Sequence, residues 1–364
     1  MIYRRIAPTH LTACAAIAMT ACSGGAPRPS YVPPAPMRVA AEAPNVANDT
    51  GNILIADQWN NRVVEVDGQH RVVWQFGDGS SIAGPHSVVG VNDAERYGKL
   101  TLIAGTGLPA GTIPACSKKP CQDNRVFVVD QTGKIVWQYG KTGVPGSKAG
   151  YLNAPVSAMH LPNGGVLVTD QGNQRVIEIS ASKRITWQYG TTGKSGAGAG
   201  ELNNPNSAQL LSNGNVLIAD ESNNRVLEVT PAGKIAWEYG SPKDTKKLDG
   251  AAYASRLSNG NTLITDSLNS RVVEVTPSGR VAWSYATNKQ HGSISAPQPS
   301  HAVRLKNGDT LVSNQIDDEI VEVTPAGKIA FQQGKVAKPG AKFDELNWPY
   351  DAKVVGDYTG LTTP

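Results

Sequence analysis

Several side chains capable of chemistry interrupt an otherwise regular repeat in this chain of 364 residues. Alignment of six repeat copies places the following residues at one equivalent position: Ser87, Ser157, Ser207, Tyr253, His301 and Asp351. His86 lies directly before this position, and Asn206 is its counterpart in a later copy. Histidine, tyrosine and aspartate side chains that converge on one point could bind an anion or a metal ion, or transfer a proton. We therefore take His86 and His301 as candidate catalytic residues, and as candidate ligand-binding residues Tyr253, Asp351, Ser157, Ser207 and Asn206. The alternative is a solvated channel that binds no ligand.

The N-terminus indicates export and attachment to a membrane. Residues 1–21 combine Arg4 and Arg5 with an apolar stretch too short to cross a bilayer as a helix, as in a secretion signal. The stretch ends in Met-Thr-Ala-Cys22, which resembles a bacterial lipobox, so we expect a lipoprotein signal peptide and lipidation of Cys22. Simple secretion, with cleavage near Ala26, is the alternative. Residues 22–48 are rich in proline and alanine and are expected to form an extended tether. Ser23 after the cysteine favours, by analogy with Gram-negative lipoproteins, an outer-membrane lipoprotein that faces the periplasm.

Charge and the remaining cysteines limit the chemistry further. The formal net charge of +4 falls to +2 when the two leader arginines are removed, so the chain lacks the basic surface of a nucleic-acid-binding protein. Cys116 and Cys121 are expected to form a local disulfide in an oxidising compartment. A metal pair is the alternative, but no histidine or further cysteine lies nearby in the sequence to complete such a site. We expect no metal site and no cofactor.

Six copies of a motif must position the candidate residues. Asp-x-x-Asn-x-Arg at residues 57–62 recurs at 170–175, 220–225 and 266–271, with degenerate copies at 123–125 and 314–319. Twelve residues after each arginine position comes an aromatic residue: Trp74, Trp137, Trp187, Trp237, Trp283 and Phe331. A ligand site needs only one copy, so repetition in nearly every copy indicates architecture. We expect each aspartate to cap turn amides beneath its arginine, and each aromatic ring to pack against the neighbouring copy.

Each copy contains four short strands joined by turns such as Asn-Gly and Pro-x-Gly. Four-stranded repeats of 46 to 50 residues predict an all-β fold, a six-bladed β-propeller spanning residues 49–364. The first copy begins at its second strand, and residues 348–355 match an innermost strand. The C-terminal strand is therefore expected to close the first blade.

The second copy is longer than the others. Pro85 and Arg125 are 40 residues apart, whereas Pro155 and Arg175 are 20 apart. We place most of the extra residues in a loop at 105–124, which contains both cysteines. Such a loop on one blade often carries function, although a tolerated surface insertion explains it equally well. At the opposite end of the innermost strands, three residues share one register and suggest a basic exit from the channel: His160, Arg256 and Arg304.

Two resemblances add expectations about function. The segment from Tyr189 to Val226 resembles the NHL repeat, whose propellers serve as binding platforms and as lyases. The segment from Leu257 to Trp283 is similar to blades of arylsulfotransferase-like propellers, in which a channel histidine carries the sulfuryl group. Residues 132–137 also resemble a blade of quinoprotein dehydrogenases, but those proteins have eight blades. Bacterial arylsulfotransferases have an additional N-terminal β-rich domain, whereas a tether is expected here.

Two hypotheses follow. The first is a cell-envelope lipoprotein whose NHL-like propeller is a binding or scaffold platform for a protein, a glycan or a small-molecule ligand at the channel mouth. The second is a propeller enzyme, arylsulfotransferase-like or an NHL-type lyase, that uses His86 or His301.

Overall fold

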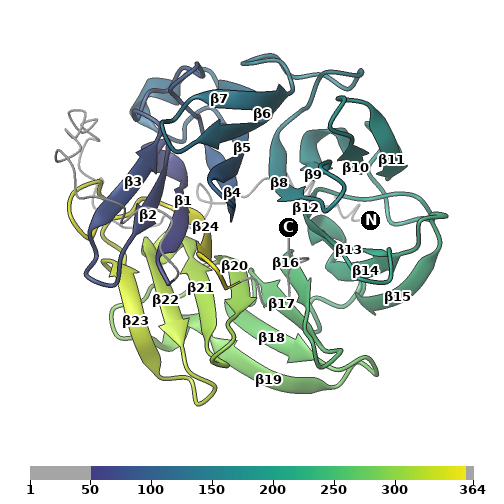
Figure 1. Ribbon diagram of the computed structural model, residues 1–364. Coiled ribbons are helices and arrows are strands. Elements are labelled where there is room, and N and C mark those ends of the chain that lie inside the picture. Colours follow the sequence, from purple (N-terminus) through teal and green to yellow (C-terminus); the bar gives the residue numbers. More distant parts are fainter. Residues whose placement is uncertain (1–50, 358–364) are drawn as a thin grey trace, which may run out of the picture.

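The computed structural model describes residues 51–357 as a ring of six four-stranded antiparallel sheets around a central channel (Figure 1). The predicted six-bladed β-propeller is therefore confirmed. The innermost strands, from blade 1 to blade 6, are β24 (Pro349–Val354), β4 (Val91–Tyr97), β8 (Pro155–His160), β12 (Pro205–Leu210), β16 (Ala251–Arg256) and β20 (Pro299–Arg304). The signal peptide, the tether and Cys22 lie outside the described residues.

The other strands follow outward in chain order within each blade. Blades 1 to 3 contain β1 (Ile53–Asp57), β2 (Arg62–Val66) and β3 (Val72–Phe76); β5 (Leu100–Leu108), β6 (Cys121–Asp130) and β7 (Ile135–Tyr139); and β9 (Val166–Asp170), β10 (Arg175–Ile179) and β11 (Ile185–Tyr189). Blades 4 to 6 contain β13 (Val216–Asp220), β14 (Arg225–Val229) and β15 (Ile235–Gly240); β17 (Thr262–Asp266), β18 (Arg271–Val275) and β19 (Val281–Ala286); and β21 (Thr310–Asn314), β22 (Glu319–Val323) and β23 (Ile329–Gly334).

Single turns of 3-10 helix are the only helices in residues 51–357. They are η2 (Gln58–Asn60), η3 (Pro114–Cys116), η4 (Gln171–Asn173), η5 (Glu221–Asn223), η6 (Thr287–Lys289) and η7 (Gln315–Asp317). Within this part of the chain, no helix has the length and hydrophobicity that a membrane span requires.

Blade 1 is completed by both ends of the described chain, as predicted. Strand β24 pairs antiparallel with β1, with Ile53 opposite Val354 and Ile55 opposite Ala352. In Figure 1 the yellow β24 lies beside the purple β1. Because β24 supplies the inner edge of the first blade, the ring closes through backbone hydrogen bonds.

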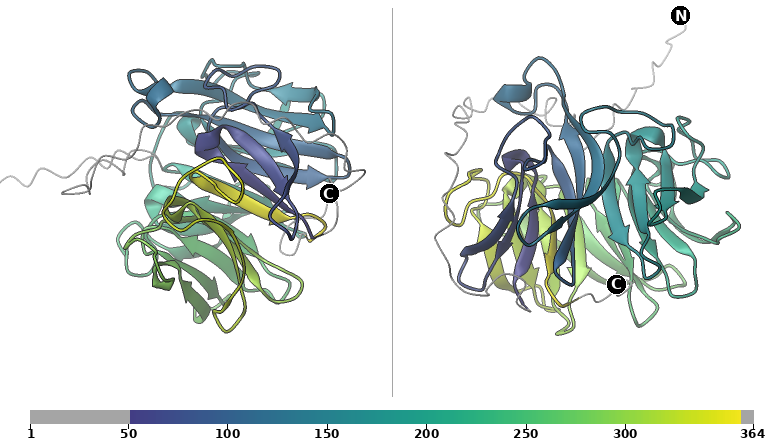
Figure 2. Two further views of the ribbon diagram at one scale, coloured as in Figure 1. Left: turned by 90° about the vertical axis from the view of Figure 1, so that its left-hand side faces the viewer. Right: turned by 45° about the horizontal axis from the view of Figure 1, so that its top comes forward.

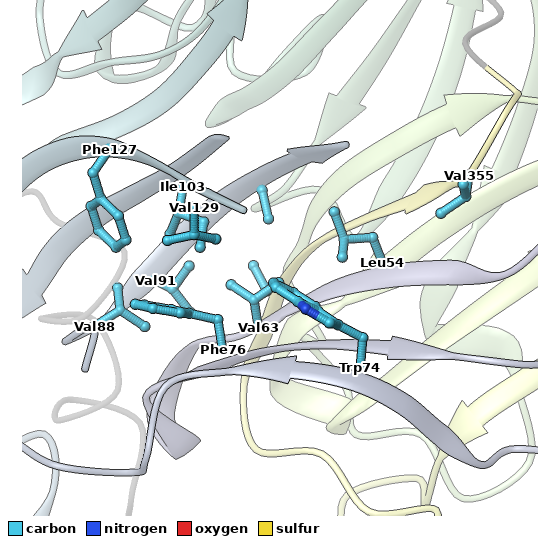
Figure 3. Close-up of a cluster of buried hydrophobic side chains, with 12 residues drawn as sticks. Leu54, Val63, Trp74, Phe76, Val88, Val91, Ile103, Phe127, Val129 and Val355 are labelled. Atoms are coloured by element: carbon cyan, nitrogen blue, oxygen red, sulfur yellow. The ribbon is translucent and has the colours of Figure 1, made fainter. Parts of the chain in front are cut away.

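The hydrophobic core lies between blades rather than inside any one of them. One cluster joins Leu54, Trp74 and Phe76 of blade 1 to Ile103 and Phe127 of blade 2 (Figure 3). Equivalent clusters fill the five other junctions between blades. A four-stranded sheet with two apolar faces cannot be stable alone, so stacking around an axis is the arrangement that buries both.

The aspartate and arginine of the repeat are architectural, as expected. Arg175 Nε donates to Asp170 at 2.8 Å, and the pairs 57–62, 123–125, 220–225 and 266–271 are alike. The other oxygen of Asp170 accepts the backbone N–H of Asn153 at 2.8 Å. The capped amide therefore belongs to the loop that leads into the innermost strand, not to the aspartate's own turn as predicted.

The aromatic residues on the fourth strands pack against the next blade, as predicted. The indole N–H of Trp187 donates to the carbonyl of Pro231 in the following blade at 3.0 Å, and Trp74, Trp237 and Trp283 make the equivalent bond. Glycine follows because the chain then passes very close to the neighbouring turn. A Cβ atom on Gly190, at φ +96°, would lie 2.4 Å from the carbonyl oxygen of Gln174.

Blade 2 departs from the predicted alignment. Its innermost strand begins at Val91, six residues after the predicted Pro85, and Asp93 instead of Ser87 occupies the aligned position. The strand begins here because of a contact made by Gly90, whose N–H donates to Asn61 Oδ1. The N–H of Ala154, just before the innermost strand of the next blade, donates in the same way to Asn124 Oδ1. Residues 85–90 therefore belong to the preceding loop.

The rest of the insertion extends the hairpin between β5 and β6. A disulfide joins Cys116 to Cys121, with Cα atoms 5.5 Å apart. Cys116 packs with Val89, Leu108 and Ile113 in a small core of its own. Figure 2 shows the blue hairpin projecting from one face of the ring. This face, which also carries the η turns, is called the hairpin face below.

Candidate functional site

The innermost strands bring most of the candidate residues together. Each strand has a β-bulge one residue before the aligned position, and bulges of this kind re-aim side chains. The bulged and aligned residues of all six strands line a cavity at the channel mouth, and they are Asn92, Asp93, Val156, Ser157, Asn206, Ser207, Ala252, Tyr253, Ser300, His301, Tyr350 and Asp351. The cavity volume among them is about 10 Å³. This is room for about one water molecule.

A hydrogen bond crosses the mouth of the channel. The hydroxyl of Tyr350 in blade 1 donates to Asn206 Oδ1 in blade 4 at 2.9 Å. The hydroxyl of Ser300 donates to the backbone carbonyl of Tyr350 at 2.6 Å. Blades 1 and 4 face each other across a six-bladed ring, so the bonded side chains of Tyr350 and Asn206 span the channel mouth.

A buried ionic cluster lies among the aligned residues. Lys353 Nζ is 2.5 Å from Asp93 Oδ1 and 2.5 Å from Asp351 Oδ2, and it also donates to the carbonyl of Ala94 at 3.1 Å. The ammonium group therefore ties the closing strand of blade 1 to the innermost strand of blade 2. An ammonium held by two carboxylates already supplies the positive charge that a bound cation would bring.

Burial governs the protonation of this cluster. It raises the pKa of Asp93 to about 6, although the Lys353 ammonium acts in the opposite direction. It raises the pKa of nearby Glu95 to about 8, so this carboxyl is mostly protonated at neutral pH. Burial alone would lower the pKa of Lys353, but Asp351 and Asp93 outweigh it and raise that pKa above its ordinary value.

Among the aligned residues, His301 has the side chain best suited to catalysis. Its ring centroid lies 3.9 Å from that of Tyr253, at 57°. Its Nδ1 is 3.1 Å from Asp351 Oδ1, but the angle does not make a hydrogen bond, and neither ring nitrogen has a partner among the described residues. Burial, assisted by the Lys353 ammonium, lowers the pKa of His301 well below its ordinary value. The imidazole is therefore neutral at physiological pH.

The acceptors at the aligned position also have a structural role. Asp351 accepts the backbone N–H of Ala94, Asp93 accepts that of Ala158, and Ser207 accepts that of Ala254. Each acceptor thus satisfies an N–H on the free edge of the next innermost strand. An unpaired buried N–H would be costly, so these side chains stabilise the ring whatever else they do.

A larger pocket opens on the hairpin face between blades 2 and 3. It is open to solvent, has a cavity volume of about 170 Å³, and shares Asn92 and Val156 with the channel-mouth cavity. Its walls include Leu108 and Pro109 of the extended hairpin, and Gln171 at the start of η4. It is much larger than the channel-mouth cavity and has room for part of a ligand.

Comparison with protein families identifies the repeat. The family described as outer membrane protein assembly factor BamB matches residues 122–336, more than half of the chain. The chain belongs to the BamB family. No curated protein matches this sequence. The NHL-repeat and arylsulfotransferase resemblances are not confirmed by these comparisons.

Solved structures similar to this BamB-family chain share its fold at low sequence identity. A Bacteroides caccae protein of unknown function is 14% identical with a TM-score of 0.56, covering 78% of this chain and 93% of that one. A streptogramin B lyase is 15% identical with a TM-score of 0.50, covering 77% and 78%. The WD40 propeller domain of Doa1 is 10% identical with a TM-score of 0.50, covering 79% and 80%.

Two features predicted for the channel of this BamB-family protein lie elsewhere. His86 is exposed in the loop before β4 and does not line the channel mouth, because the blade 2 alignment was shifted. The predicted basic exit is wrong as well, although its residues do share one register. Arg256 pairs with Glu228 and Arg304 with Glu274 of the preceding blade, each over a tryptophan. His160 stacks on Tyr97 of the preceding blade.

Sequence reasoning missed Asp93 and Lys353 of the ionic cluster, and the neighbouring Glu95. A correct alignment of blade 2 at Val91 would have placed Asp93 and Glu95 beside the channel. Among residues 51–357, no group of three His, Cys, Asp or Glu side chains is arranged to hold a metal ion.

Proposed function

We propose that this protein is a non-catalytic binding platform of the cell envelope, anchored through Cys22, which presents its hairpin face to a protein partner. The family name points to the assembly of outer membrane proteins as the process in which that partner takes part. A periplasmic position on the outer membrane fits both the leader sequence and this name.

One observation supports the platform more than any other. The channel mouth is crossed by the bond between Tyr350 and Asn206, and Lys353 and its two carboxylates hold one another. Little room is left there for a substrate. The disulfide hairpin, in contrast, adds an open pocket and an exposed tip on the same face.

Crosslinking from the hairpin tests this proposal. A photoreactive amino acid at exposed Ala110 is expected to capture the same envelope protein repeatedly in living cells. The control position is exposed Ala232, in the turn between β14 and β15, which lies at the opposite end of the strands. Replacement of residues 109–120 by two glycines, with Cys121→Ser, should reduce outer-membrane protein levels as a gene deletion does. A truncated protein that supports wild-type levels would refute the platform.

An enzyme is the second candidate, and the state of His301 favours it. A neutral histidine with two unpartnered nitrogens beside Tyr253 could act as a base or a nucleophile. Aryl sulfate esters and a streptogramin B are suitable test substrates, given the arylsulfotransferase resemblance and the similarity in fold to a streptogramin B lyase. If the protein is an enzyme, His301→Ala should reduce turnover about a hundredfold or more, while the exposed-loop control His86→Ala should not. Turnover with that pattern would overturn the platform.

A further inference from the structure

The pocket between blades 2 and 3 has an unusual lining for its size. Among its twelve lining residues there is no charged side chain and no aromatic ring. Five side-chain amides surround it instead, from Gln58, Asn92, Gln122, Asn153 and Gln171. Apolar contact comes from the hairpin and from the start of β8. Burying a charged ligand without a charged partner would be costly, so the lining selects for a neutral ligand that can hydrogen bond.

Gln171 and Gln122 are two of the pocket amides that are left with hydrogen-bonding capacity. Gln171, in blade 3, is 8% exposed, and its Nε2 is buried with no partner among the described residues. Gln122, in the blade 2 hairpin, accepts from Asn124 through Oε1 at 2.7 Å, so its Nε2 remains available as a donor. By contrast, Gln58 and Asn92 are bonded to each other at 2.7 Å. A buried donor without an acceptor is uncommon in a folded protein and marks a place where a ligand oxygen would be stabilising.

These two donors lie on different walls of the pocket. Gln122 belongs to β6 and Gln171 to η4 of the next blade. Successive carbonyl groups of an extended peptide point in opposite directions, so one segment can accept from both walls. The apolar side chains of Leu108 and Val156, which are 2% and 3% exposed, line the same space. No aromatic face is present on which a sugar ring could stack.

We propose that this pocket binds an extended, uncharged peptide segment through the amide donors of Gln171 and Gln122. The inference rests on the proposed platform function and names the chemistry of what the hairpin face recognises. A partner protein would insert a short neutral segment between the disulfide hairpin and blade 3. Its backbone carbonyls would accept the two amide hydrogen bonds, and its side chains would contact Leu108 and Val156.

The test uses the purified full-length protein and acetyl-tetrapeptide amides built from glycine, alanine, valine and leucine. Binding is measured by ligand-observed NMR. The same peptides with a central aspartate or lysine, and chitotriose, serve as comparison probes. Gln171→Glu replaces the donating nitrogen by an accepting oxygen and should weaken binding of the neutral peptides about tenfold. The matched control is Gln188→Glu in β11 of the same blade, where the amide donates to Gly190 outside the pocket. This control should bind the peptides like the wild type.

Gln122→Glu keeps the acceptor for Asn124 and provides a second variant if Gln171→Glu does not fold. The proposal is overturned if no neutral peptide binds, if both pocket variants bind like the wild type, or if charged peptides or chitotriose bind with the same dependence on these glutamines. Crosslinking from Ala110 without peptide binding would refute this inference and leave the platform standing. Peptide binding without crosslinking would refute the platform and leave the pocket assignment standing.

Discussion

The ionic cluster at the channel mouth gives the sharpest test of how the ring is closed. Lys353 is 7% exposed and contacts Asp93 of blade 2 and Asp351 of its own strand, at 2.5 Å each. Lys353→Met removes the positive charge while keeping a similar side-chain volume. Two buried carboxylates then face each other without a counter-ion. Removing one partner of a buried ion pair costs about 3–5 kcal/mol of folding free energy.

That loss should depend on pH in a definite direction. Burial already raises the pKa of Asp93 to about 6 with Lys353 present, and loss of the lysine raises it further. A carboxyl whose pKa is raised in the folded state stabilises the fold below its unfolded pKa and loses that contribution as the pH rises through its folded pKa. The variant should therefore be most destabilised above pH 7 and should recover part of its stability near pH 5, where Asp93 is protonated.

Thermal unfolding of the full-length protein measures this effect. A chain of this length changes its Tm by about 2 °C per kcal/mol, so a drop of roughly 6–10 °C is expected at pH 7.5. Lys338→Met, at an exposed position, is the control and should leave the Tm unchanged. Adding Asp93→Asn to Lys353→Met should restore much of the loss at pH 7.5. If Lys353→Met melts like the wild type, or loses the same stability at pH 5 and pH 7.5, the assignment of charge in the channel is wrong.

Three further predictions concern the channel, the closing strand and the anchor. Burial raises the pKa of Glu95 to about 8, so ionisation of this carboxyl destabilises the fold as the pH rises through that value. The Tm of Glu95→Gln should therefore lie several degrees above that of the wild type at pH 9 and equal it at pH 5. Deletion of residues 343–364 removes β24 and should abolish a sharp unfolding transition, whereas deletion of 358–364 alone should not; an unchanged transition in the longer deletion would disprove closure by this strand. Cys22→Ser should release the protein from the membrane fraction, and a variant that still sediments with membranes would contradict lipidation.

The fold could be predicted from the sequence because the same stabilising interactions are encoded in every copy of the repeat. The aspartate and arginine of each second hairpin hold the loop that enters the innermost strand, as Asp170 and Arg175 show. The aromatic residue of each fourth strand reaches the next blade, as Trp187 does. These interactions recur at fixed spacing, so counting residues was enough to predict the strands, the blades and the closing strand.

The channel was harder to predict because blade 2 breaks the spacing in two places. Pro85 resembles the proline that begins other innermost strands, and alignment on it placed His86 and Ser87 at the channel mouth. The strand actually begins at Val91, where Gly90 takes over the hydrogen bond to the preceding blade. No local pattern distinguishes these alternatives, since the choice depends on a contact with Asn61 in another blade. Asp93 was missed for the same reason.

The polar character of the channel has a structural cause that limits what mutations there can reveal. Innermost strands have no neighbour on one edge, and their buried N–H groups need acceptors. Asp351, Asp93 and Ser207 provide them for the following blade, so changes at these positions would disturb the ring before they disturbed any ligand. Gln171 and Gln122 differ in this respect, because their amide nitrogens hold no other part of the fold. A functional effect of replacing them, with an unchanged Tm, can therefore be attributed to binding.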